Sequence, residues 1–389
     1  THTHTHTHTH THTHTLSTLS TLSTLSTQHK AHTRSTHTKH THTKHTMGSN
    51  REQQQELYDA LVRAAEQGSL ADIQSLLDQQ ADINALDINS MNYTPLHAAS
   101  LNGHHQCIEL LLDRHADINA LNKHNYTPLH DASSNGHHQC IELLLDRHAN
   151  VNARTRHNDN ALHLASSGGH HQCIELLLDR HANVNARTRN NDIALHLASM
   201  NGDHQCVELL LDRHADVHAR NNVKKTPLHH ASMKGHHQCI ELLLDRHADI
   251  NARDHDNLTP LHDASCHHQC IELLLDRHAD IHARTHRNHT PLHLASWNGH
   301  HHQCVEFLLD RHANVNARDS NNNAPLHFAS WNGHHQPIMI LLGHGADNSL
   351  INVRRFVFVS SLLQMRAALL NASTSFDPSR SIMLMTMSH

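Results

Sequence analysis

The chain has 389 residues, a formal net charge of −6, 37% hydrophobic residues and only 3% aromatic residues. The lack of a basic charge excess argues against nucleic-acid binding, and no apolar run reaches the 18 or so residues that a membrane-spanning helix requires. The scarcity of aromatic side chains argues against a large globular core, which usually relies on them for buried area. The composition instead favours a thin structure of two layers built from Leu, Ile and Ala.

The first 52 residues are a low-complexity segment rich in His and Thr, with alternating Thr-His followed by Leu-Ser-Thr repeats. Such a segment buries too little apolar area to offset the entropy of an ordered chain, so we expect it to be disordered. Alternating Thr-His is also what a CA-dinucleotide tract encodes. We therefore hypothesise that Met47 is the true start and that the preceding segment is translated repeat DNA.

Residues 53–352 are predicted to contain nine copies of one unit. A weak first copy lies near Leu61, and eight further copies carry a Leu-His pair at intervals of 33, 33, 33, 33, 33, 31 and 34 residues. A fixed period of this length is typical of a solenoid, in which each unit packs on its neighbours. The marker histidines are His97, His130, His163, His196, His229, His262, His293 and His327.

The second copy shows which elements to expect in each unit. Thr94 is a good N-cap residue, and Pro95 is compatible with the first position of a helix. This short helix should end at Gly103. The stretch HHQCIELLL that follows has apolar residues at helical spacing, which predicts a second helix, and a polar loop leads to the next unit.

This helix–turn–helix–loop unit closely resembles the ankyrin repeat. The matching motifs are Thr-Pro-Leu-His in the first helix, Asn-Gly-His at the turn, and Ile-Glu-Leu-Leu-Leu-Asp in the second helix. The resemblance implies an all-α ankyrin-repeat solenoid of about nine repeats. It also implies a protein that is not an enzyme, needs no cofactor, and binds another protein in the concave groove formed by its first helices and loop tips.

Three departures from the family pattern are expected to matter. The residue after the second helix, usually glycine, is histidine in seven copies and should have a positive φ. The eighth copy has gained one residue in the run His300–His302. The seventh copy has lost two residues around Cys266, which should weaken its contacts and make a soft joint near residues 262–270.

The chain contains 54 histidines and eight cysteines, which raises the alternative of a His-rich metal-binding protein. Equivalent helices in stacked repeats lie about 8–10 Å apart, too far for neighbouring copies of His104 and Cys107 to share one zinc ion. We therefore predict no metal site in the repeats. Cysteines that recur with the motif indicate buried, reduced thiols and a cytoplasmic or nuclear protein, and no secretory leader precedes them.

The Asp-Arg-His motif that ends seven second helices pairs an acid with a histidine, as catalytic sites do. Catalytic groups occur once, in a cleft, whereas this motif recurs along a solvated helix end. We interpret it as a capping and solubility feature and predict no catalytic residue.

Positions that vary between otherwise similar repeats are the candidates for partner binding. One such position follows Ala-Ser in the first helix, where two adjacent repeats carry the protein's two tryptophans, and basic residues vary at the loop tips. Tryptophan is a favoured anchor in interfaces, and basic tips would suit an acidic stretch on a partner. The predicted contacts are Leu101, Met200, Met233, Trp297, Phe328, Trp331, Arg154, Arg156, Arg187, Arg189, Lys224 and Lys225.

The sequence thus predicts a monomeric scaffold or adaptor for another protein, with no nucleic-acid or membrane partner. A second alternative is a substrate adaptor of a ubiquitin ligase, because this family often pairs its repeats with a C-terminal recruitment box. Residues 353–389, the tail where such a box would lie, contain no motif that we recognise.

Overall fold

The computed structural model describes residues 42–86, 91–299 and 301–347, and all regular structure within these ranges is helical. Contacts divide the chain into two units, Thr1–Glu52 and Gln53–His389, and the repeats lie in the second. The described helices form nine pairs, which confirms the predicted all-α repeat fold. The pairs are α2 (His42–Gln67) and α3 (Leu70–Asp78), α4 (Pro95–Asn102) and α5 (His105–Asp113), α6 (Pro128–Ser134) and α7 (His138–Asp146), α8 (Ala161–Gly168) and α9 (His171–Asp179), α10 (Ala194–Asn201) and α11 (His204–Asp212), α12 (Pro227–Lys234) and α13 (His237–Asp245), α14 (Pro260–Asp263) and α15 (His268–Asp276), α16 (Pro291–Asn298) and α17 (His302–Asp310), and α18 (Pro325–Asn332) and α19 (His335–Gly343).

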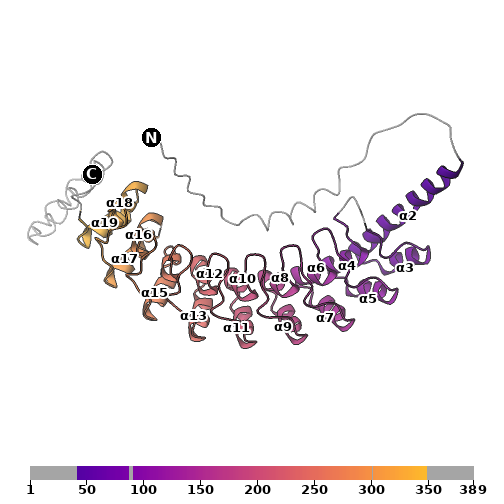
Figure 1. The fold of residues 1–389 in the computed structure, drawn as a ribbon, viewed down its shortest axis with the longest axis horizontal. Coiled ribbons are helices and arrows are strands. Elements are labelled where there is room, and N and C mark those ends of the chain that lie inside the picture. Colours follow the sequence, from indigo (N-terminus) through magenta and orange to yellow (C-terminus); the bar gives the residue numbers. More distant parts are fainter. Residues whose placement is uncertain (1–41, 87–90, 300, 348–389) are drawn as a thin grey trace, which may run out of the picture. The chain divides into compact units, whose positions relative to one another are not determined.

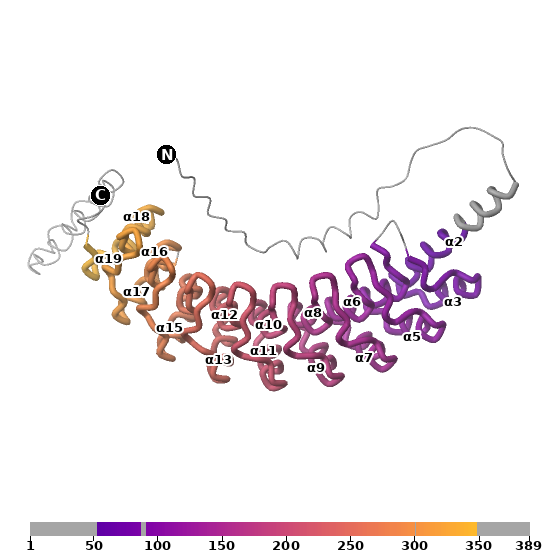
Figure 2. The backbone as a smooth tube through the Cα atoms, viewed as in Figure 1, coloured from indigo at the N-terminus to yellow at the C-terminus, as the bar shows by residue number. Residues whose placement is uncertain are grey.

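The repeats form two layers of helices. Figure 1 shows the first helices α6, α8 and α10 side by side in one row and the second helices α7, α9 and α11 in another. The backbone trace in Figure 2 follows the same path in each unit, with the connecting loops projecting beside the first helices. Each unit therefore presents one first helix and one loop to the same side of the array.

The first helices begin as the sequence predicts. Thr94 has an extended backbone, its side chain accepts a hydrogen bond from the backbone N–H of His97, and Pro95 occupies the first turn. The His97 ring closes the cap, because its Nδ1 accepts a hydrogen bond of 3.2 Å from the Thr94 backbone N–H. The backbone N–H groups of Thr94 and His97, which have no partner within the helix, are both hydrogen-bonded in this way.

The turn after the first helix depends on glycine at Gly103, which has φ 78° and ends α4. A Cβ atom here would lie 2.6 Å from Nδ1 of His137 in the next repeat. We expect Gly103→Ala to lower the free energy of unfolding by about 1–3 kcal/mol, through backbone strain and this overlap. Urea unfolding followed by circular dichroism measures the loss, and an unchanged midpoint would contradict the packing described.

The second helices supply most of the core. In α5, Cys107, Ile108 and Leu111 are buried, and equivalent residues are buried in each following helix from α7 to α17. Seven of the eight cysteines are buried, free thiols, and Cys266 is half-buried. Burial raises the pKa of Cys140 to about 12, so this thiol stays protonated and behaves as a small apolar side chain.

The residue that follows each second helix has the predicted left-handed backbone. Its φ lies between 64° and 68° at seven histidines, all with exposed side chains, and the ninth repeat has Gly345 with φ 82° at the equivalent position. The seven are His115, His148, His181, His214, His247, His278 and His312.

The two residues lost from the seventh repeat shorten its first helix, whereas the sequence suggested only a shorter turn between the helices. Helix α14 has four residues, whereas the first helices from α4 to α18 otherwise have seven or eight. Its residues after Asp263 turn directly toward α15 without the left-handed glycine that ends α4. Softness at this joint remains a prediction.

The first helix starts earlier than predicted. Helix α2 begins at His42, within the segment for which we expected disorder up to residue 52. Residues 51–57 are mostly Glu, Gln and Arg, which are good helix formers, and a helix extends at little cost once a turn has formed. The Thr-His tract before residue 42 and the tail 353–389 lie outside the described residues.

Candidate partner-binding surface

The marker histidines hold successive repeats together. His97 is fully buried, and its Nε2–H donates a hydrogen bond of 3.0 Å to the carbonyl of Tyr126 in the next repeat. His163 bonds in the same way to the carbonyl of Ala186, at 2.9 Å. Burial lowers the pKa of each to about 4, so both rings are neutral at physiological pH. These histidines are structural, as the family pattern implies.

The histidines that precede the second helices also bond to the neighbouring repeat. The Nε2 of His137 lies 3.0 Å from the carbonyl of Leu101, and its ring covers Gly103. Its nitrogen is therefore occupied by the fold and not directed toward a shared ion. Among the described residues, no group of three or more His, Cys, Asp or Glu is placed to hold a metal ion.

The Asp-Arg-His motif forms a ladder of ion pairs along the outer helix ends. The arginine of one repeat bonds to the aspartate of the preceding repeat, and the side chains are about one third to one half exposed. Exposed ion pairs of this kind contribute about 0–1 kcal/mol each. The pairs, at 2.5–2.8 Å, are Arg147–Asp113, Arg180–Asp146, Arg213–Asp179, Arg246–Asp212, Arg277–Asp245 and Arg311–Asp276.

Two of the predicted basic contacts instead stabilise the loops. The Arg154 guanidinium donates hydrogen bonds of 2.7 Å to the carbonyl of Asn158 and of 3.2 Å to that of Arg187. Arg187 bonds in the same way to Asn191 and Arg220, at 3.2 and 3.0 Å. The same kind of bond to the next repeat recurs at Arg220, Arg253 and Arg284.

Lys225 is also an internal residue, contrary to the prediction that it contacts a partner. Its Nζ lies 2.8 Å from both carboxylate oxygens of Asp263, and only 16% of its side chain is exposed. The predicted basic contacts that remain at the surface are Arg156, Arg189 and Lys224, whose side chains are exposed. The backbone N–H of Arg156 and of Arg189 bonds to the carbonyl of His124 and of His157 in the preceding loops, so neighbouring tips are joined.

The two tryptophans are the most exposed members of the predicted row on the first helices. Trp297 in α16 is 48% exposed and Trp331 in α18 is 47% exposed, and Met233 in α12 is 38% exposed. Leu101 and Met200 are half-buried. All five lie near the ends of first helices and therefore on one row of the array.

Phe328 supports the tryptophans and is not itself a surface residue. It is 6% exposed, and its ring centroid lies 5.8 Å from that of Trp297 and 5.3 Å from that of Trp331. His289 and His293 contact its ring from the preceding repeat. Sequence alone placed Phe328 among the contacts because it neighbours Trp331 on the helix, but its side chain points into the interface between repeats.

Comparison with known proteins agrees with this architecture. Residues 61–155, 154–221, 195–285 and 278–352 match the family model of ankyrin repeats, and together they extend over more than half of the chain. The chain belongs to the ankyrin repeat family. The crystal structure of the human ASB11 ankyrin repeat domain is similar, with a TM-score of 0.53 and 28% identity, over 58% of this chain and 100% of that one.

Ankyrin repeats form a protein–protein interaction domain and are typically not enzymatic, so the surface rather than a cleft is where function should be sought. No helix in the described part of this ankyrin array is both long and apolar enough to cross a membrane.

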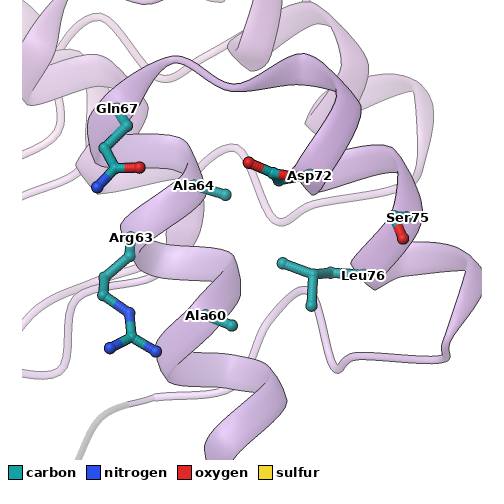
Figure 3. A pocket seen from close by; sticks show the side chains of 7 residues that line it. All are labelled: Ala60, Arg63, Ala64, Gln67, Asp72, Ser75 and Leu76. Carbon is teal, nitrogen blue, oxygen red and sulfur yellow. The ribbon is translucent and has the colours of Figure 1, made fainter.

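A hollow lies on the first ankyrin repeat, outside the predicted row. It has a volume of about 350 Å³ and lies between α2 and α3, where Ala60, Ala64 and Leu76 meet the polar rim of Arg63 and Asp72 (Figure 3). Terminal repeats require a polar outer face to keep a repeat array soluble. The polar rim fits this role of an end cap, and none of the predicted contacts lies there.

Two exposed apolar residues of the ankyrin loops were absent from the predicted contacts. Leu121 is 50% exposed and Val223 is 51% exposed. Both positions vary between repeats, as the predicted contacts on the first helices do, but neither residue carries a charge.

Proposed function

We propose that this ankyrin repeat protein is a scaffold or adaptor that binds a partner protein in the concave groove, along its first helices and loop tips. The observation that carries the proposal is the pair of half-exposed tryptophans, Trp297 and Trp331, held over the buried ring of Phe328. A large, rigid aromatic surface with little conformational freedom to lose is a favourable anchor for a partner.

The exposed basic tips suggest the chemistry of the partner. Arg156, Arg189 and Lys224 lie on successive loops, which backbone hydrogen bonds from Arg189 to His157 and from Asn222 to Asn190 connect. An acidic stretch of the partner would be attracted to them, and an apolar side chain of the same partner would rest on the tryptophans. The charges would then set the register and the association rate, and the tryptophans most of the affinity.

The protein would act as a monomer in the cytoplasm or nucleus. The free, buried thiols support this compartment, because free thiols persist where the environment is reducing.

Alanine replacement of both tryptophans tests the proposal. The full chain is immobilised with chelator present, so that the His-rich tract retains nothing through metal, and is exposed to lysate. Because truncating an anchor tryptophan typically costs about 2 kcal/mol or more, Trp297→Ala with Trp331→Ala should reduce capture of a specific partner more than tenfold.

Leu70→Ala provides the matched control, since Leu70 is an exposed apolar residue on the outer helix α3. It should leave capture unchanged. A partner retained equally by the double variant and the wild type would refute the proposed anchor.

A further inference from the structure

The ion pair of Lys225 and Asp263 is much less exposed than the Arg–Asp pairs of the outer helices. The two side chains are 16% and 9% exposed, and the Asp254 carboxylate, 4% exposed, lies 3.8 Å from the same Nζ. Breaking a buried pair is strongly destabilising, because the remaining charge is left without a partner. The pair therefore differs in strength from the exposed Arg–Asp ladder on the outer helices.

The pair joins two particular repeats. Lys225 precedes the N-cap residue Thr226 of α12 in the sixth repeat, and Asp263 is the last residue of the shortened helix α14 in the seventh. Other bonds cross the same interface: Asn251 accepts a hydrogen bond of 2.9 Å from the backbone of Asp280, and the ring of His267 covers Gly235. The seventh repeat is thus well attached on the side of the sixth.

The interface between the seventh and eighth repeats lacks two of these features. The turn of the seventh repeat contains no glycine, so the histidine that begins the next second helix has none to cover. His282 occupies the place where Asn251 and Asn316 bond to the following repeat. Fewer residues of α14 are also available to face α16, because α14 has only one helical turn.

Some contacts remain across this second interface. His262 bonds to the carbonyl of His289 at 3.1 Å, and Asn298 donates a hydrogen bond of 2.9 Å to the Ser265 hydroxyl. Arg311 also pairs with Asp276 at 2.8 Å, and Arg284 donates a hydrogen bond of 2.8 Å to the carbonyl of Arg318. These contacts hold the seventh and eighth repeats together without the glycine contact and the asparagine bridge. In an array stabilised by nearest-neighbour contacts, the interface with fewest of them opens first.

We propose that the array has a hinge between its seventh and eighth repeats, and that the Lys225–Asp263 ion pair locks the seventh repeat to the sixth. Bending at this hinge moves the eighth and ninth repeats, which carry Trp297 and Trp331, relative to the loops that carry Arg156, Arg189 and Lys224. The hinge does not depend on the proposed function, but a partner that contacts both sets of residues would select one bend angle.

Hydrogen exchange of the full chain, followed by mass spectrometry, tests the position of the hinge. Amides of residues 264–268 should exchange at least tenfold faster than the equivalent amides in the turn of the third repeat. Insertion of Asn-Gly between Cys266 and His267 restores the sequence pattern of the other turns and should slow this exchange at least tenfold. Equal rates in the two wild-type turns, or no effect of the insertion, would overturn the hinge.

The lock is tested in the same experiment with two variants. Lys225→Met leaves the Asp263 carboxyl buried alone and should speed exchange of residues 254–263 at least tenfold. Lys225→Met combined with Asp263→Leu removes both charges, so it should restore at least half of the lost protection on a logarithmic scale. Exchange that is unaffected by Lys225→Met, or a double variant no better protected than the single one, would refute the lock.

Discussion

We expect the protein to lose its fold between pH 7 and pH 5, well above the pH at which many proteins denature. Burial lowers the pKa of His97, His130 and His163 to about 4, against 6.5 for an unburied imidazole. Burial lowers the pKa to the same value in three later repeats, at His229, His262 and His293. The unfolded chain therefore binds more protons than the folded one throughout this range.

The direction and the size of this loss of stability follow from the linkage between proton binding and folding. A depressed pKa stabilises the fold fully above 6.5, and this stability is lost as the pH falls from 6.5 toward 4. Between pH 7 and pH 5.5 each of the six histidines contributes a loss of about 1.2 kcal/mol, or roughly 7 kcal/mol together, compared with a typical total stability of about 5–15 kcal/mol. Burial has the opposite effect on carboxyls, because it raises the pKa of Asp131 and of Asp263. Protonation of these two groups therefore stabilises the fold on acidification, but they are fewer than the buried histidines.

Urea unfolding at pH 7.5, 6.5 and 5.5 measures this loss as a falling midpoint. High salt screens repulsion between the many exposed histidines, so a fall that persists in salt belongs to the buried ones. Histidine NMR at pH 6.5, where most of this stability is still present, should show these six rings in the neutral form. A midpoint that stays constant or rises on acidification would contradict the burial of these rings.

Replacing the seven left-handed histidines by glycine should stabilise the protein. His115 has φ 67° and an exposed side chain. Its backbone N–H donates a hydrogen bond of 3.0 Å to the carbonyl of Leu112, and a glycine at this position would donate the same bond. A residue with a Cβ is disfavoured in this conformation, although glycine also stabilises the unfolded chain by entropy. The net gain should be about 0.5–1 kcal/mol per site, or roughly 4–7 kcal/mol for all seven if distant sites are additive.

The same substitution at a helical site provides the control. Glu142→Gly, at an exposed position in the middle of α7, should lower stability by about 0.5–1 kcal/mol, because glycine weakens a helix interior. Thermal and urea unfolding of the seven-site variant should show a higher midpoint than the wild type. A lower midpoint would mean that the histidine side chains make contacts beyond those seen here.

The repeat fold could be predicted from the sequence because its determinants are local and recur. Thr94, Pro95 and Gly103 specify the ends of a helix by their own backbone preferences. The positive φ of His115 was implied by the resemblance to ankyrin repeats, which usually have glycine at this position. The short α14 was not predicted: two missing residues suggested a shorter turn between the helices, whereas the structure shortens the helix itself.

The candidate surface could be predicted only in part, because exposure depends on neighbouring repeats. Arg154 and Arg156 are the same residue type two positions apart, yet one bonds to backbone carbonyls and the other is exposed. Recurrence was the usable signal: the arginine at the position of Arg154 appears in six repeats, as a structural motif position does. Nothing local to Lys225 or Phe328 reveals the residue that each contacts in the neighbouring repeat.

Fluorine NMR of the protein labelled with fluorotryptophan tests the proposed surface most directly. The chain contains two tryptophans, both at this surface, so the spectrum should contain one resonance for Trp297 and one for Trp331. When a captured, unlabelled partner is added to saturation, the proposed groove predicts that both resonances shift or broaden. A complex that forms while both resonances stay unchanged would show that the partner binds elsewhere.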